Sequence, residues 1–181
     1  MIKLIYLFSI ILLLMTLSGC VGYMGPLSPE DIAMNAVTKK TAEELKIKYH
    51  LFLIGMGGSG KKDKITLSTI SFELEYTMSK EKCRKVIIDC IQQFLKNINT
   101  DNRLSQYLFE KPFTYKNIEV TIFMSNPDRS SVFHPKFRVA TLKDGLIYYK
   151  TVDEETNRYK SVEEEPYEEA LQKVQFGNEL E

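Results

Sequence analysis

The fold is set by residues 64–98, which read KITLSTISFELEYTMSKEKCRKVIIDCIQQFLKNI. In the first part, residues 64–77, apolar or aromatic side chains alternate with polar ones. The first set is Ile70, Phe72, Leu74 and Tyr76, and the second is Thr69, Ser71, Glu73 and Glu75. A period of two residues is typical of a strand with one buried and one solvated face. We therefore predict a strand over residues 64–77.

An amphipathic helix follows this strand. Ser79 is suited to cap its first turn, and apolar residues then recur every three or four positions. They are Cys83, Val86, Ile87, Cys90, Ile91, Phe94, Leu95 and Ile98. This spacing predicts a helix that buries one side, and residues 97–102 end it with turn-forming side chains. The inner face of the sheet is the partner surface that this stripe needs.

Two more elements are predicted upstream. Residues 28–31, Ser-Pro-Glu-Asp, combine a cap, a first-turn proline and first-turn acids, and they predict a helix over residues 29–46. Residues 48–54, KYHLFLI, predict a strand that ends at Gly55. The glycine-rich link from there to residue 64 makes the two strands a hairpin.

Downstream, the sequence predicts a strand, a hairpin and a final helix. Residues 117–125 alternate as a strand does, and Asp144-Gly145 is typical of a tight hairpin turn. That turn joins strands 137–142 and 146–152. The remaining segments are a short helical turn at 104–109, a polar loop at 126–135, a charged connector at 153–160 and a helix at 166–175. The acidic run Glu163-Glu164-Glu165 stands at the N-terminus of this helix, where the helix dipole favours it.

The element order is therefore α-β-β-α-β-β-β-α. We expect a single α+β domain over residues 29–175, a two-layer domain with a mainly antiparallel sheet and helices packed on one face, followed by a frayed tail at 176–181. Hydrophobic residues make up 44% of the 181-residue chain, which is enough for a core. The 24 basic and 24 acidic residues leave no net charge. Nucleic acid is not an expected partner, because its binders usually carry a clustered basic excess.

Residues 1–19 have the layout of an export signal. Lys3 is followed by a mostly apolar run that ends at Leu17. The run is shorter than the roughly 20 apolar residues that a membrane-spanning helix needs. It ends in Leu17-Ser18-Gly19-Cys20, which resembles the lipobox of bacterial lipoproteins. The resemblance covers residues 1–20 and implies cleavage between Gly19 and Cys20, with lipid attached to the Cys20 thiol.

The resemblance also implies a location. Residues 20–28 would be the lipidated cysteine and a short tether, and two or three acyl chains such as palmitate give stable anchoring. The expected partners are the membrane, through this lipid, and an envelope protein. Val21 stands where an inner-membrane retention rule favours Asp, so we expect an outer-membrane anchor that faces the periplasm.

Cys83 and Cys90 are the other cysteines. Seven residues of helix separate their Cα atoms by roughly 10 Å, whereas a disulfide needs less than about 7 Å. Both lie on the apolar stripe, so we expect buried thiols. No histidine or further cysteine stands nearby at a ligand spacing, and no metal is predicted.

Residues 55–62, GMGGSGKK, are similar to a phosphate-binding loop, which has glycine, four residues and then Gly-Lys. Lys62 stands where that motif needs a Ser or Thr for Mg²⁺. A strand also follows, where the motif needs a helix N-terminus. We therefore predict no nucleotide or other cofactor. The expectation is a flexible hairpin loop and candidate binding loop made of Gly55, Gly57, Gly58, Gly60 and Lys61.

Neither histidine marks a catalytic site. His50 falls within a predicted strand, where a packed imidazole is expected. His134 shares a predicted loop with Asp128, Ser130 and Ser131, but catalytic triads normally converge from separate, rigid elements. We favour a membrane-anchored, non-catalytic binding or assembly module of the envelope. The alternative is a lipid-anchored periplasmic hydrolase.

Overall fold

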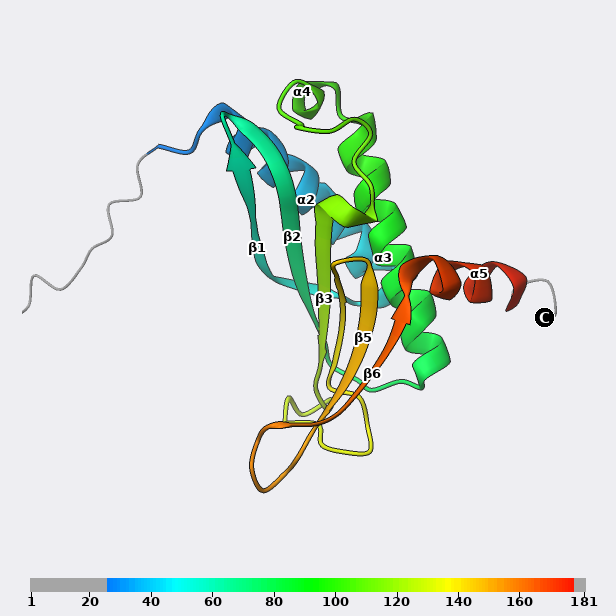
Figure 1. Cartoon of the computed structure of the whole chain (residues 1–181). Helices are drawn as coiled ribbons and strands as arrows, with labels where there is room; N and C mark the ends of the chain where they lie inside the picture. The colour runs from blue at the N-terminus through cyan, green and yellow to red at the C-terminus, as the bar shows by residue number, and fades with distance from the viewer. Residues whose placement is uncertain (1–25, 178–181) are drawn as a thin grey trace, which may run out of the picture.

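The computed structural model describes residues 26–177. The signal segment 1–19, Gly19 and Cys20 therefore lie outside the described residues. Within residues 26–177, the elements are α2 (Pro29–Tyr49), β1 (Phe52–Lys61), β2 (Lys64–Leu74), α3 (Lys80–Thr100), α4 (Asn102–Ser105), the 3₁₀ turn η1 (Tyr115–Asn117), β3 (Ile118–Met124), β4 (Val139–Lys143), β5 (Leu146–Val152), β6 (Tyr159–Pro166) and α5 (Tyr167–Gly177). Figure 1 shows their arrangement.

The strands of the described region form one six-stranded sheet in the order β1-β2-β3-β4-β5-β6. β2 and β3 run parallel, and the other neighbouring pairs are antiparallel. A parallel pair needs a crossover connection, and α3 provides it. The predicted two-layer α+β architecture with a mainly antiparallel sheet is confirmed.

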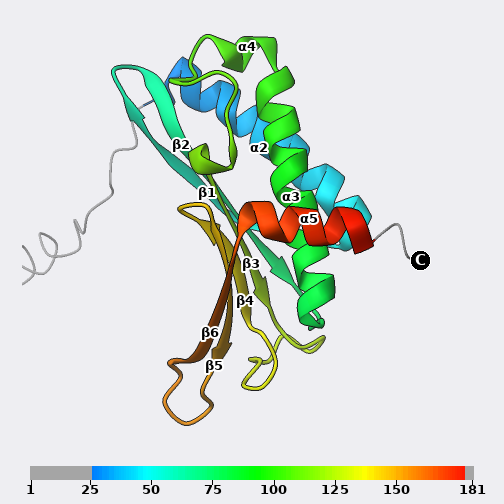
Figure 2. The ribbon, with the colours of Figure 1, turned by 45° about the vertical axis from the view of Figure 1, so that its right-hand side comes forward.

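The helices α2, α3 and α5 cover one face of the sheet and leave the other open (Figure 2). The core lies between the layers. It includes Phe72, Phe94, Phe113, Tyr149, Leu45, Leu51 and the isoleucines of α3. The stripe predicted from Cys83 to Ile98 packs here, because its spacing keeps these side chains on the sheet side of α3.

The local helix and turn signals are also confirmed. The Ser28 hydroxyl accepts a hydrogen bond from the Asp31 amide at 3.2 Å, and Ser79 caps α3 in the same way. Asp144 and Gly145 both have positive φ, 50° and 80°, as the predicted tight hairpin between β4 and β5 requires.

Three predicted segments are wrong. Residues 48 and 49 belong to the end of α2 rather than to a strand, and His50 caps this helix; the Tyr49 hydroxyl donates a hydrogen bond to Asp89 of α3. The glycine-rich segment after Gly55 is part of β1 rather than a loop. The acidic run 163–165 lies in β6, which pairs with β5 along residues 159–166, instead of at the start of a helix.

Candidate functional site

The glycine-rich segment forms half of a long hairpin. β1 pairs with β2 from Phe52↔Glu73 to Lys61↔Lys64, so the turn itself consists of Lys62 and Asp63. Both turn residues have positive φ, 52° and 59°. The predicted hairpin is present, but its turn lies beyond the glycines.

Two of these glycines are required by the close approach of the strands. A Cβ at Gly58 would lie 2.5 Å from the Leu67 carbonyl oxygen, and one at Gly60 would lie 2.8 Å from that of Lys64. A Cβ at Gly55 would make an ordinary contact, 3.6 Å from the Ser71 Cβ. Gly58 and Gly60 therefore allow β1 to pair closely with β2, and Gly55 does not have this role.

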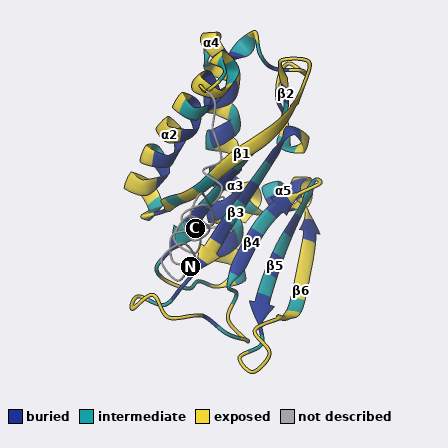
Figure 3. Cartoon of the chain, turned by 90° about the vertical axis from the view of Figure 1, so that its left-hand side faces the viewer, coloured by how far each residue is buried: buried dark blue, intermediate teal, exposed yellow. Residues whose placement is uncertain are grey.

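β1 is also an exposed edge of the sheet. Within residues 26–177 no strand pairs with its outer side, and no residue from Phe52 to Gly60 carries a charge. Phe52, Ile54 and Met56 expose 39%, 53% and 44% of their surfaces. The opposite edge, β6, has the sequence YKSVEEEP, so charges and a proline protect it. Figure 3 shows both edges in the exposed colour.

A groove of about 360 Å³ separates the hairpin from the first turns of α2. Met34 and Met56 give it an apolar wall, and Asp31 and Lys61 contribute opposite charges to its lining. Ser68 also lines the groove, and its buried hydroxyl has no hydrogen-bond partner in the described structure. Of the predicted binding loop, the groove is lined by Gly57, Gly58, Gly60 and Lys61 but not by Gly55.

The structure does not assemble a catalytic triad around either histidine. His50 is exposed, and it ends α2 with a left-handed φ of 57°, so the prediction of a packed strand histidine is wrong. The His134 Nδ1 lies 3.2 Å from the Thr151 hydroxyl, which in turn lies 2.7 Å from that of Ser161. Asp128 instead accepts a hydrogen bond from the Ser130 amide in its own loop.

Cys83 and Cys90 are buried and unpaired, as predicted. Burial raises the pKa of the Cys83 thiol to about 12, and it raises the pKa of Cys90 as well. Both thiols are therefore protonated at neutral pH and are poor nucleophiles.

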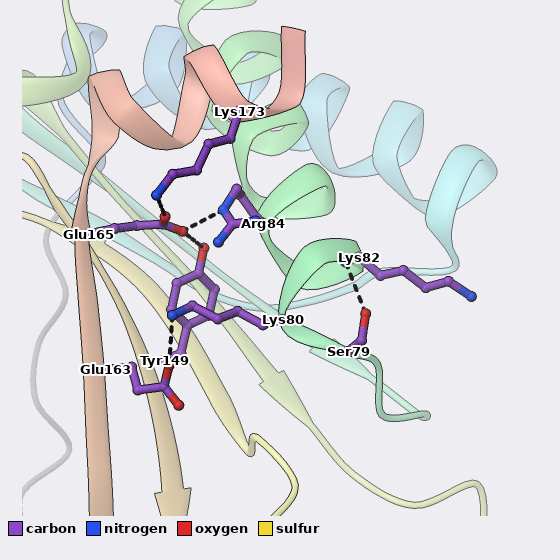
Figure 4. Close-up of polar contacts among 8 residues, drawn as sticks. All are labelled: Ser79, Lys80, Lys82, Arg84, Tyr149, Glu163, Glu165 and Lys173. Atoms are coloured by element: carbon purple, nitrogen blue, oxygen red, sulfur yellow. Dashed lines mark hydrogen bonds and ion pairs between the residues drawn. The ribbon is translucent and has the colours of Figure 1, made fainter. Parts of the chain in front are cut away.

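The sequence analysis missed a buried ionic cluster centred on Glu165, which Figure 4 shows. One carboxylate oxygen accepts from the Arg84 Nε at 2.7 Å and from the Tyr149 hydroxyl at 2.7 Å. The other accepts from the Lys173 Nζ at 2.8 Å. Nearby, Lys80 pairs with Glu163 at 2.6 Å and lies over the Tyr149 ring. No sequence signal indicated this cluster, because its members come from α3, β5, β6 and α5.

This cluster holds elements together instead of offering a reactive group. Burial alone would raise the pKa of Glu165, but the hydrogen bonds from Arg84, Lys173 and Tyr149 lower it to about 2. Burial and the bond to Glu165 raise the pKa of Tyr149. A carboxylate with such a low pKa and three donors is a weak base, so the cluster's role is to connect both strands of the sheet's last hairpin to α3 and α5.

Comparison with known proteins gives no relative on which to base a function: no family model matches the chain, and a search of curated proteins finds no match. In the part of the chain that the structure describes, no group of three or more His, Cys, Asp or Glu residues is arranged to hold a metal ion. Among those same residues, none of the helices combines the length and apolarity that crossing a bilayer requires.

Proposed function

We propose that this chain is a lipid-anchored lipoprotein of the bacterial cell envelope and that its domain is a non-catalytic binding or assembly module. In this proposal, Cys20 carries the lipid, and the domain binds an extended segment of an envelope protein along β1. The observation that carries the binding proposal is the exposed edge of β1, which is ten residues long and has no charge before Lys61.

An uncharged edge strand suits the addition of another strand, and between its two register shifts, at Leu53/Gly55 and Ser59/Gly60, β1 pairs regularly with β2. Within residues 26–177 no other strand pairs with its outward N–H and C=O groups, and main-chain hydrogen bonds supply affinity in this mode of recognition. The exposed side chains of Phe52, Ile54 and Met56 would add apolar contacts and some choice of sequence. Edge strands without a binding role are usually shortened or carry charges, as β6 does.

The anchor proposal is compatible with the position of the described N-terminus. Residues 26–28 directly precede α2 and lie beside the tip of the β1–β2 hairpin (Figure 1). From Cys20 to Pro26 an extended chain spans at most about 20 Å. A lipid at Cys20 would therefore keep the hairpin end of the domain near the bilayer, with the outer membrane as the proposed location.

The hydrolase alternative has less support. The hydrogen-bonded side chains of His134, Thr151 and Ser161 include no carboxylate to orient the imidazole. The Glu165 carboxylate already accepts hydrogen bonds from three other side chains. The His134–Thr151 pair therefore lacks the third group that orients the base of an activated nucleophile, and the Thr151 side chain is buried.

Site-specific photo-crosslinking tests the binding proposal. A photoreactive residue at Ile54, on β1, should form a discrete crosslinked adduct in living cells. The matched control is Val162 on β6, since the two side chains are 53% and 52% exposed. Equal crosslinking at both positions, or none at Ile54, would count against binding at the β1 edge.

A separate measurement tests the anchor. The wild-type chain should incorporate radiolabelled palmitate and fractionate with membranes, whereas Cys20→Ala should do neither. Cys83→Ala serves as the control cysteine substitution, because this thiol is buried. Normal processing and membrane retention of Cys20→Ala would refute the anchor proposal and leave the edge-strand proposal intact.

A further inference from the structure

A second hollow lies on the open face of the sheet, at the end opposite to the β1–β2 hairpin tip. Its volume is about 480 Å³. The lining residues are Phe123, Arg138, Val139, Val152, Asn157, Arg158 and Tyr159. They come from β3, β4, β5, β6, the loop between β5 and β6, and, for Arg138, the loop that precedes β4. Its volume lies in the range of small-molecule sites.

Strand register brings these residues together. Phe123 is paired with Val139, and Val152 with Tyr159. The second pair follows a register shift, because Thr151 pairs with Ser161 and Lys160 is left without a partner residue in the ladder. Such bulges redirect side chains and are common next to functional sites. Here the bulge sets Tyr159 opposite Val152 at the wall of the hollow.

The hollow is basic and has an aromatic rim. Arg138 and Arg158 line it, and none of its seven lining residues is acidic. The Arg138 Nη1 donates to the Asn157 Oδ1 at 3.3 Å, and within residues 26–177 no ion pair joins either guanidinium to a carboxylate. Asp153, in the same loop as Asn157 and Arg158, is already paired with Lys160 at 3.0 Å, and Glu154 and Glu155 of that loop do not line the hollow.

A further cation borders this hollow. Lys150 pairs with Val139 in the β4–β5 ladder. Its Nζ lies 5.0 Å from the Tyr159 ring centroid and 5.4 Å from that of Tyr148. These cation–π contacts hold the ammonium on the open face, which adds positive charge beside the two arginines. Glu73, which pairs with Phe123, and Glu164, which pairs with Tyr148, are acids on the same face of the sheet, and neither lines the hollow.

We propose that this hollow binds a small organic oxyanion, a carboxylate or phosphate group on a ring-shaped or apolar body. Guanidinium groups match the geometry of both oxyanions and can bind them with two parallel hydrogen bonds. The Phe123 and Tyr159 rings and the two valines would cover the body of the ligand. This inference goes beyond the proposed function and depends neither on the lipid at Cys20 nor on the β1 edge.

Calorimetric titration of the full chain in detergent tests the site, with benzoate, phenyl phosphate, inorganic phosphate and benzamide as probes. Benzoate, phenyl phosphate or both should bind saturably, and neutral benzamide should bind at least about tenfold more weakly. The tighter of the two anions identifies which oxyanion the site prefers. Inorganic phosphate that binds as well as phenyl phosphate, or benzamide that binds as well as benzoate, would overturn the proposal.

Variants locate the binding. Arg158→Gln and Arg138→Gln should each weaken binding by about tenfold to a hundredfold, the usual effect of removing a hydrogen bond between charged groups. Arg129→Gln is the matched control, because Arg129 is exposed and pairs with Glu75 outside the hollow. If Arg138→Gln fails to fold, Arg158→Gln alone decides, because Arg158 is exposed. Unchanged binding in Arg158→Gln, or equal loss in Arg129→Gln, would refute the site.

Discussion

Replacing Glu165 by Gln should destabilise the domain strongly at neutral pH and hardly at all at pH 2. The Glu165 side chain is 5% exposed and accepts hydrogen bonds from Arg84, Tyr149 and Lys173. Glutamine keeps the shape of glutamate but removes the charge. The partly buried Arg84 guanidinium then loses its counter-ion, which is the costly part of disrupting a buried ion pair.

The magnitude follows from two independent arguments. The pKa of Glu165 falls from 4.5 to about 2 on folding, and a shift of that size corresponds to about 3 kcal/mol. Breaking a buried pair by removing one partner typically costs about 3–5 kcal/mol. Lys173 is half exposed, so its share of this stabilisation is small. We expect a loss of about 3 kcal/mol, which a domain stabilised by about 5–15 kcal/mol survives.

The pH dependence has a definite sign. Because folding lowers this pKa, the ionised group stabilises the folded state above pH 4.5, and that contribution is lost as the pH falls from 4.5 to about 2. Urea unfolding of wild type and Glu165→Gln at several pH values measures it. The difference in the free energy of unfolding should be about 3 kcal/mol at pH 7 and should approach zero near pH 2.

The control is Glu163→Gln. Glu163 pairs with Lys80 but is 51% exposed, so its loss should cost less than about 1 kcal/mol. The reasoning would be refuted if Glu165→Gln matched wild type at pH 7, or if the two variants were equally destabilised.

Three other predictions concern separate parts of the fold. Gly58→Ala should destabilise the domain by about 1–3 kcal/mol in urea unfolding, because the added Cβ would lie 2.5 Å from a backbone carbonyl oxygen. The control Gly55→Ala should cost less than about 1 kcal/mol, and equal effects of the two substitutions would contradict the strand-packing role of Gly58. Cys83 and Cys90 should resist a thiol reagent at pH 8 in the folded protein and react on unfolding in urea, because both are buried; rapid labelling of the native protein would be the contrary result. His134→Ala should cost less than about 1.5 kcal/mol, since the Thr151 hydroxyl keeps its contact with Ser161; a larger loss in the same unfolding assay would show that His134 has a greater structural role.

The elements that the sequence predicted well are those whose signals are local. The stripe of α3, the alternation of β3 and the Asp144-Gly145 turn each depend on residues within one element. Periodicity and turn chemistry describe such elements directly. The layer architecture followed from their order.

The missed elements depend on partners distant in the chain. Glycine and glutamate are rare in strands, yet β1 forms because Gly58 and Gly60 can approach β2 closely. β6 pairs along its length with β5, and Arg84 and Lys173 neutralise the charge of Glu165 within it. Neither cause is visible within the segment itself.

The candidate sites show the same contrast between local signals and contacts with distant parts of the chain. Four of the five residues of the predicted binding loop, Gly57, Gly58, Gly60 and Lys61, line the groove beside α2. The basic hollow on the open face was not predicted, since strand register and a bulge in β6 bring its arginines and aromatic rings together.

The parallel pairing of β2 with β3 has a consequence for how the chain folds. The β1–β2 hairpin and the β3–β6 meander each contain mostly contacts between neighbours in sequence, and can form early. Their union requires Ser68 to meet Ile118 after α3 has closed a long connection, and such non-local contacts slow folding. We expect the rate-limiting transition state to contain α3 docked between the two halves. Conservative truncations such as Ile91→Val should then slow refolding, whereas truncations in α5 should mainly accelerate unfolding.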